Sequence, residues 1–167
     1  GDIDRGWGVA MTTLTNERSA IAGGGMVQFD EVLMLARELG RTGDAVARQK
    51  LAKLYTYFRI TRFLGYRVQT AVSNGRPPGP ESSVMKLHIS RQYGDGGDLL
   101  MWLLGANGMT WLADAPFDGF FQGLFLAQWV PRIGGGTDQV QRNIVGERVL
   151  GLPAEPRVDK DVPFRDL

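Results

Sequence analysis

Residues 133–148 read Ile-Gly-Gly-Gly-Thr-Asp-Gln-Val-Gln-Arg-Asn-Ile-Val-Gly-Glu-Arg, and the rest of the chain is organised around this stretch. Three successive glycines allow backbone conformations with positive φ and a close approach to a neighbouring group. Thr137 follows in the position of a helix N-cap, and Val140 and Ile144 begin an apolar helical face. We therefore expect a glycine turn that opens a helix running from Thr137 to about Leu150.

This glycine turn has two readings. Free N–H groups at the start of a helix suit an anion, most often a phosphate. In the simpler reading the glycines only turn the chain. The local pattern favours the simpler reading, because the stretch is neither a Walker loop nor a Rossmann fingerprint.

Composition limits the classes of protein and the kinds of site. The chain has 167 residues, 43% of them hydrophobic, and a net charge of +1, which fits one domain with a real core and gives no reason to expect nucleic acid. The absence of cysteine excludes thiolate nucleophiles and cysteine metal sites, and His88 alone cannot form a histidine metal cluster. No apolar run reaches the length of a membrane span. We expect a cytoplasmic domain whose ionic chemistry rests on carboxylates, arginines or a bound cofactor.

Helical periodicity without any convincing strand pair predicts an all-α fold. The first half is expected to form a short helix at 6–14, a polar junction at 15–19, a second helix to about Leu39 and a third from the N-cap Asp44 to about Asn74. Gly23 to Gly25 lie within the second helix on this prediction, and a helix break at these glycines is an equal alternative.

The second half begins after a strong turn signal at 74–79. A fourth helix is predicted from Pro80, with an interruption or kink at Gly94, Gly96 and Gly97, and an apolar segment then resumes at 99–104. Asp114 and Pro116 are expected to start a fifth helix. Its aromatic-rich face is interpreted as core plus subunit interface; it comprises Phe117, Phe120, Phe121, Leu124 and Phe125. His88 is expected to be packed or hydrogen-bonded rather than a ligand.

Three stretches together resemble the C-terminal domain of flavin-dependent acyl-CoA dehydrogenases. The segment from the glycine turn to Pro153 is similar to the family's Gly-Thr-x-x-Ile/Val-Gln-Arg-Asn signature, Gly105-Ala-Asn-Gly108 to its Gly-Gly-x-Gly turn, and residues 6–18 to its domain-entry helices. The resemblance implies an antiparallel four-helix-bundle-type domain over 1–151 and an extended or disordered tail over 152–167. It also implies a fragment of a larger protein, with an N-terminal helical domain and a middle β-domain before Gly1.

The resemblance implies α,β-desaturation of an acyl-CoA thioester with FAD as cofactor. Many members carry the catalytic glutamate directly before the Gly-Thr of the signature, but here that position is Gly135. Isovaleryl-CoA-dehydrogenase-like members carry it in an earlier Glu-Arg pair, which Glu17 and Arg18 match. We therefore expect Glu17 to be the base and Arg18 to shape the substrate side. In the alternative, Glu17 is a helix carboxylate paired with an arginine, and catalysis lies elsewhere.

The same resemblance assigns cofactor contacts. Gly135, Gly136, Thr137 and Gln139 would approach the flavin and its phosphates, and Gly105 to Gly108, including Asn107, would touch the adenosine end from a neighbouring subunit. Arg41 stands where the family often has a pyrophosphate-binding arginine, but here it lacks the usual aromatic partner. Trp102 replaces a glutamine often found three residues before the Gly-Gly-x-Gly turn.

The expected partners are an acyl-CoA substrate, electron-transfer flavoprotein as electron acceptor, and further subunits in a homo- or hetero-oligomer built as a dimer of dimers. No metal is implied. Two other interpretations remain: a non-catalytic or half-site partner subunit of a mixed oligomer, and a stand-alone helical bundle that binds a phosphate ligand.

Overall fold

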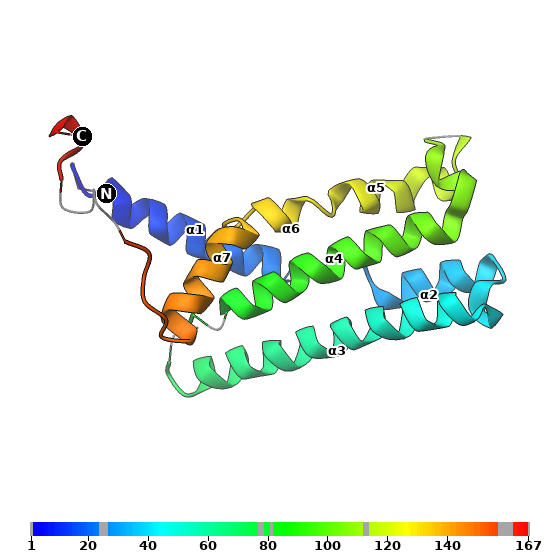
Figure 1. The fold of residues 1–167 in the computed structure, drawn as a ribbon, viewed down its shortest axis with the longest axis horizontal. Coiled ribbons are helices and arrows are strands. Elements are labelled where there is room, and N and C mark those ends of the chain that lie inside the picture. The colour runs from blue at the N-terminus through cyan, green and yellow to red at the C-terminus, as the bar shows by residue number, and fades with distance from the viewer. Residues whose placement is uncertain are drawn as a thin grey trace.

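The computed structural model describes residues 2–23, 27–76, 79–80, 82–111, 114–156 and 162–166. These residues form helices and turns without a strand, which confirms the all-α prediction. Four helical segments run up and down beside one another, namely α2 (Phe29–Glu38), α3 (Ala45–Ser73), α4 (Ser82–Leu104) and α5 (Phe120–Ala127) continued by α6 (Val130–Ile133), as Figure 1 shows. α1 (Gly6–Gly23) and α7 (Asp138–Ile144) lie together at one end of this bundle.

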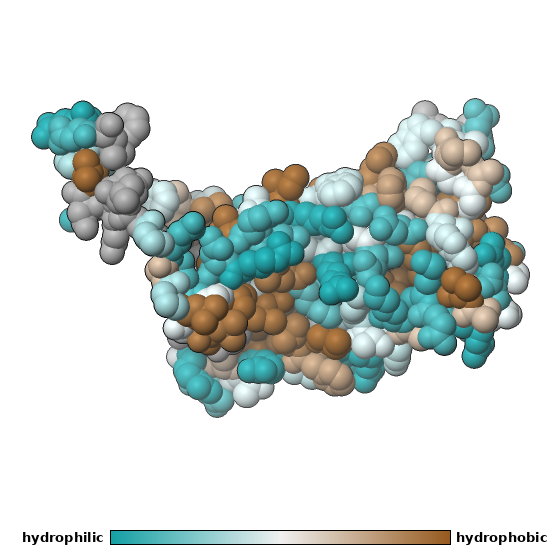
Figure 2. Space-filling view, in the orientation of Figure 1, coloured by the Kyte–Doolittle hydropathy of each residue, from teal (hydrophilic) through white to brown (hydrophobic). Residues whose placement is uncertain are grey.

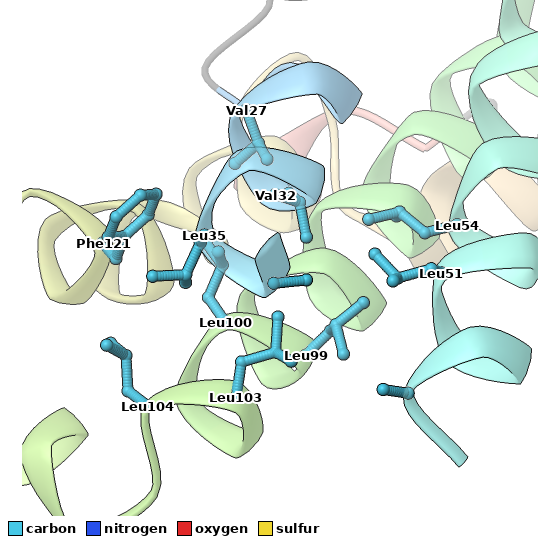
Figure 3. Close-up of a cluster of buried hydrophobic side chains, with 12 residues drawn as sticks. Val27, Val32, Leu35, Leu51, Leu54, Leu99, Leu100, Leu103, Leu104 and Phe121 are labelled. Carbon is cyan, nitrogen blue, oxygen red and sulfur yellow. The ribbon is translucent and has the colours of Figure 1, made fainter. Parts of the chain in front are cut away.

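The hydrophobic core lies where α2, α3, α4 and α5 meet (Figure 3). α2 contributes a face that includes Val32 and Leu35, α3 contributes Leu51 and Leu54, and α5 contributes Phe121. α4 supplies Leu99, Leu100, Leu103 and Leu104, each almost fully buried. This helix therefore forms the centre of the domain.

The boundaries of the first helices differ from the sequence prediction. α1 is continuous from Gly6 to Gly23, so the expected junction at 15–19 is wrong. Glutamate and arginine favour helix, and the threonine and asparagine there cost only a few tenths of a kcal/mol each, too little to end it. α2 begins at Phe29, after a capping box between Gln28 and Glu31, so the predicted start of the second helix directly after the junction is wrong, whereas its predicted end at about Leu39 is confirmed. The alternative of a break agrees with these bounds, while Gly24 and Gly25 lie outside the described residues.

Asp44 caps α3 as predicted, because its carboxylate accepts hydrogen bonds from the amides of Val46 and Ala47 at 2.8 and 3.1 Å. His88 is hydrogen-bonded as predicted. Its Nε2 lies 2.9 Å from the Tyr57 carbonyl oxygen and its ring packs edge-on against Tyr57.

α4 passes through Gly94, Gly96 and Gly97 without the expected interruption. The three glycines lie against neighbouring helices, and the packing against another backbone is tightest at Gly97. A Cβ on Gly97 would lie 3.3 Å from the Cα of Phe125, a Cβ on Gly96 would lie 3.5 Å from Leu54, and one on Gly94 would overlap the Arg132 guanidinium. The backbone of α4 thus approaches the backbone of α5 at Gly97, whereas Gly94 and Gly96 face side chains of α6 and α3.

The predicted start of the fifth helix at Asp114 and Pro116 is wrong. Phe117, Asp118 and Gly119 all have positive φ, at 58°, 52° and 78°, so the chain turns there and α5 begins only at Phe120. Of the aromatic-rich face, Phe121 enters the core, whereas Phe117 and Phe120 are exposed.

α7 starts at Asp138 and changes into a π-helix at Val145–Val149, after which Gly151 turns the chain with φ 67°. Residues 150–156 have no regular structure, and Phe164–Asp166 forms a 3₁₀ turn. No helix in the described ranges is long and apolar enough to cross a membrane.

A cleft of about 690 Å³ lies between the end of α3, the start of α4 and the π-helix. Figure 2 shows apolar side chains gathered at this end of the face in view. The lining mixes apolar with basic and hydroxyl side chains, and includes Leu64, Arg67, Val68, Val84 and Val149. This mixture does not by itself define a ligand.

Candidate functional site

The glycine turn takes the backbone conformation that its sequence predicts. Gly135 and Gly136 have φ of 65° and 92°, in the region that favours glycine. The hydroxyl of Thr137 then accepts a hydrogen bond from the Val140 amide at 3.3 Å, which confirms Thr137 as the N-cap of α7.

Glu17 reaches this turn from α1, although 118 residues separate the two positions. The Glu17 Oε1 atom accepts a hydrogen bond from the Gly135 amide at 3.2 Å. Glu17 itself is exposed, while Gly135 is buried. The structure therefore brings together the two positions that the sequence singled out as alternative locations of a catalytic carboxylate. Arg18 follows Glu17 in α1, and its side chain lies outside the described part of the molecule.

Two side chains of α4, which the sequence reasoning did not single out, hold the chain on either side of the turn. Before it, the Ser90 hydroxyl donates to the Pro131 carbonyl at 2.9 Å. After it, the Lys86 ammonium donates to the Asp138 carboxylate at 2.9 Å. Lys86 lies in the apolar run Val84-Met-Lys-Leu, three residues before the buried Ile89 and therefore on the same face of the helix. A lysine on that inner face was the sequence signal that could have identified it.

Gln141 contacts the turn itself and was likewise missed. It is fully buried, and its Nε2 donates to the Gly135 carbonyl at 2.9 Å. A Cβ on Gly136 would lie 2.7 Å from the same Nε2 atom. Glycine at this position is thus needed both for its φ and for the space that Gln141 occupies.

The second group of predicted cofactor contacts lies at the other end of α4. Gly105 has φ 57° and nothing near its missing Cβ, and both it and Asn107 are exposed. The Asn107 carbonyl accepts hydrogen bonds from the Gln122 amide at 3.1 Å and the Thr110 hydroxyl at 2.9 Å, which fix the turn.

Arg41 and Trp102, the two departures from the family pattern, contact each other. The Arg41 guanidinium lies 4.6 Å from the Trp102 ring centroid and forms an ion pair with Asp44 at 3.0 Å. Hydrogen bonds from the backbone amides of Ala47 and Val46, joined by the charge of Arg41, hold the pKa of Asp44 below its ordinary value. Trp102 therefore supplies the aromatic partner that the residues after Arg41 lack.

The two groups of candidate residues are far apart within one chain. Glu17, the glycine turn and Gln139 belong to the α1–α7 end, whereas Gly105, Asn107 and Arg41 belong to the opposite end (Figure 1). α4 runs between them, and a rise of 1.5 Å per residue gives it a length of about 33 Å. The structure thus defines an all-helical domain with a carboxylate at a glycine turn and a second exposed glycine turn at its far end.

Residues 4–150 match the family model of the acyl-CoA dehydrogenase C-terminal domain, and the chain belongs to that family. The family resemblance predicted from the sequence is thereby confirmed. Among curated relatives, the acyl-CoA dehydrogenase IpdE1 of Mycobacterium tuberculosis is 34% identical over 156 residues, which cover 91% of this chain and 40% of that protein. The chain thus spans about two fifths of the length of this relative.

Solved structures agree with this assignment. One named "Tcur3481-Tcur3483 steroid ACAD" matches with a TM-score of 0.81 and 29% identity, over 93% of this chain and 42% of that one. The ChsE4-ChsE5 complex from Mycobacterium tuberculosis matches with a TM-score of 0.68 over the same shares at 23% identity, and it supports the fold alone.

The exposed groups are suited to hydrogen-bonding the FAD that the family implies. Gln139 offers a side-chain amide, Gly105 offers backbone with open space where a Cβ would stand, and Arg41 keeps N–H groups beyond the one bound to Asp44. The carboxylate of Asp138 beside the glycine turn is neutralised by Lys86, so it does not repel a phosphate. The donors of Gly105 and Arg41 therefore suit an anionic dinucleotide, whereas the glycine turn also carries the Glu17 carboxylate.

Proposed function

We propose that this chain is the C-terminal domain of a flavin-dependent acyl-CoA dehydrogenase in which Glu17 removes the α-proton of the thioester. The observation that carries the proposal is the 3.2 Å hydrogen bond between Glu17 and the amide of Gly135. It holds a carboxylate at the turn where many family members carry a glutamate and this chain has Gly135. The N-terminal helical and middle β-domains belong to the same proposal, since relatives such as IpdE1 are more than twice as long.

The chemistry assigned to this chain is a proton transfer. The Glu17 carboxylate takes the proton from Cα, while the pair of electrons left at Cα forms the new double bond to Cβ. Bound FAD would accept the hydride that leaves Cβ. Gly135, Gly136, Thr137 and Gln139 would contact that cofactor at this end, and Arg18 would shape the substrate side.

The substrate proposed is an acyl-CoA that carries a steroid or a comparable ring system. Support comes from the structure named as a steroid ACAD, which matches this chain at 29% identity and a TM-score of 0.81. Electron-transfer flavoprotein is the proposed electron acceptor.

A mixed oligomer is the second proposal, because the same structure's name joins two proteins. The positions of the candidate groups support sharing of a site between subunits. From Ser90 and Lys86, which hold the chain beside the glycine turn, to Leu104, about 21–27 Å of helix separates the two groups. If the groups came from different protomers, both could contact one cofactor without its having to span that length. In this form the chain supplies either Glu17 or the Gly105 turn to each site.

The test is anaerobic bleaching of the flavin in the full-length protein by steroid-bearing and straight-chain acyl-CoA thioesters. We expect a yellow protein that bleaches faster with the ring-bearing substrate. Glu17→Gln should keep its flavin and lose bleaching by about 10³-fold or more, as expected when a general base is removed. Glu38→Gln, an exposed glutamate at the end of α2, is the matched control and should bleach like the unmodified protein.

Retained bleaching in Glu17→Gln would refute the base assignment. Mass spectrometry of the purified complex then distinguishes the two assemblies. A single polypeptide argues against the mixed oligomer, whereas two different polypeptides of the family support it.

A further inference from the structure

The ion pair between Lys86 in α4 and Asp138 in α7 joins two residues that are 52 positions apart in the sequence. Only 2% of the Lys86 side chain and 20% of the Asp138 side chain are exposed. A buried ammonium is tolerated only when it is paired, because removal of its partner leaves an uncompensated charge. The pair therefore fixes where the first residue of α7 stands relative to α4.

Ser90 fixes the chain on the other side of the glycine turn. It is one helical turn beyond Lys86 on α4, so both side chains leave the same face of that helix. Its hydroxyl binds the carbonyl of Pro131, and both residues are buried. The turn at 134–136 is thus held by one rigid helix at both of its ends.

Gln141 transmits this anchoring to the amide of Gly135, which contacts Glu17. It belongs to the same short helix as Asp138, and its side chain binds the carbonyl of Gly135. The N–H of Gly135 points to Glu17. A shift of the start of α7 therefore moves the amide that holds the carboxylate.

We propose that Lys86 and Asp138 are positioning residues for the reaction: their buried ion pair, acting through Gln141 and the Gly135 amide, sets the direction of the Glu17 carboxylate toward the α-carbon of the substrate. The inference rests on the proposed function of Glu17 as the base. It adds two residues that act through Gln141 and the Gly135 amide. Misplacement of a reacting group by about 1 Å costs on the order of 100-fold in rate, so small shifts of the turn are sufficient.

The decisive variant is the double substitution Lys86→Met with Asp138→Asn in the full-length flavoprotein. It removes both charges, so no unpaired buried charge remains and the melting temperature should stay within about 4 °C of the unmodified protein. The positioning role predicts that kcat nevertheless falls about 10- to 100-fold, with KM changed less than about twofold. Incorporation of deuterium from D₂O at the α-carbon should slow by the same factor.

A second readout does not depend on activity. Amide hydrogen exchange of the peptide that contains residues 134–137 should become about tenfold faster in the double variant, because the turn has lost its anchor to α4. The matched control removes another interhelical pair, Lys53 and Asp95, 2.7 Å apart between α3 and α4. Lys53→Met with Asp95→Asn should leave both kcat and the exchange of this peptide unchanged.

A double variant with normal melting temperature, normal kcat and normal exchange would overturn the proposal and leave the pair a purely structural role. If the double variant does not fold, Asp138→Glu answers the same question. It keeps both charges but lengthens the acidic side chain, and we expect a normal melting temperature with a reduced kcat. Normal kcat in that variant would equally refute the positioning role.

Glu17→Gln is measured in parallel, so the two claims fail separately. Retained proton transfer in Glu17→Gln refutes the proposed function, whereas loss in Glu17→Gln together with normal kcat in the double variant refutes only the positioning role.

Discussion

Glu17 illustrates how one backbone amide can orient an exposed side chain. A glutamate on a helix surface samples several rotamers, and a hydrogen bond from an amide to a carboxylate is charge-assisted and selects among them. The Gly135 amide is available for this purpose because its own carbonyl is bound by Gln141 and the turn cannot rotate freely. Gly135 and Gln141, which are distant from Glu17 in the sequence, therefore set the orientation of its side chain.

Asp95 is a second carboxylate whose surroundings have a measurable consequence. Burial alone would raise its pKa, but hydrogen bonds from Lys53 and Tyr57 and the charges of Lys53 and Arg91 outweigh burial and hold the pKa below the ordinary value of 3.8. A lowered pKa in the folded state adds stability that is fully present above pH 3.8. That contribution is lost as the pH falls through the lowered value.

We predict that Asp95→Asn lowers the free energy of unfolding at pH 6 and weakens its decline below pH 4. Asparagine cannot be protonated in this range, so the variant lacks the contribution that the unmodified protein loses on acidification. Urea titrations at several values between pH 3 and pH 7 measure the difference. Asp98→Asn, an exposed neighbour on α4, serves as control. Parallel pH curves for Asp95→Asn and the unmodified protein would contradict the prediction.

Some residues of the candidate site could be predicted from sequence and others could not. The glycines of the turn and the N-cap Thr137 follow from local chemistry, because positive φ and capping depend on adjacent residues. Glu17 was reached only through family resemblance, since nothing near it points to Gly135. The roles of Lys86 and Ser90 were not predicted, because a hydrogen-bond partner on a distant element leaves no pattern in the sequence near these residues.

At the scale of elements, α4 shows that glycine can mark close packing as well as a helix break. Three glycines within four positions predicted an interruption, on the basis of their intrinsic cost of about 1 kcal/mol each. Packing of α4 against its neighbours offsets that cost, most clearly at Gly97, where the missing Cβ allows the backbone of α5 to approach. Helix propensity and tertiary packing compete. The sequence of α4 itself reveals the propensity but not the packing against other helices.

We predict that Gly97→Ala destabilises the protein while Gly65→Ala stabilises it. The new Cβ of Gly97→Ala would lie 3.3 Å from the backbone of α5, and such overpacking costs about 1–3 kcal/mol, more than the gain in helix propensity. Gly65 lies within α3 with nothing within 4 Å of its missing Cβ, so alanine there should add about 0.5–1 kcal/mol. Thermal or urea unfolding of both variants measures the two effects, and equal stability of the two would show that the packing argument is incorrect.

At the scale of the whole molecule, the separation of the two candidate groups predicts complementation between damaged subunits. In a homodimer whose sites each use Glu17 from one protomer and the Gly105 turn from the other, a mixed dimer of two different variants contains one intact site. We predict that co-expression of Glu17→Gln with Gly105→Val restores about a quarter of the normal rate, because half of randomly formed dimers are mixed.

Valine is chosen at position 105 because a β-branched residue is strained at φ 57°. The measurement compares acyl-CoA-dependent flavin reduction in the co-expressed protein with that of each variant alone. An inactive mixture would argue that copies of this chain do not share the site.

Because α4 is one continuous helix, the angle about its axis between the features at its two ends is fixed. Near the beginning of α4, Lys86 and Ser90 hydrogen-bond to residues on either side of the glycine turn. At the other end of α4, its last residue, Leu104, leads directly into Gly105. Each residue of an α-helix turns the chain by about 100°, so the angle between these two features is set by the number of residues between them. Insertion of a single residue at the middle of α4 would swing one turn a quarter of the way around the helix axis while the other stayed in place. The spacing within this helix therefore encodes the mutual orientation of both ends of the domain, independently of which side chains fill it.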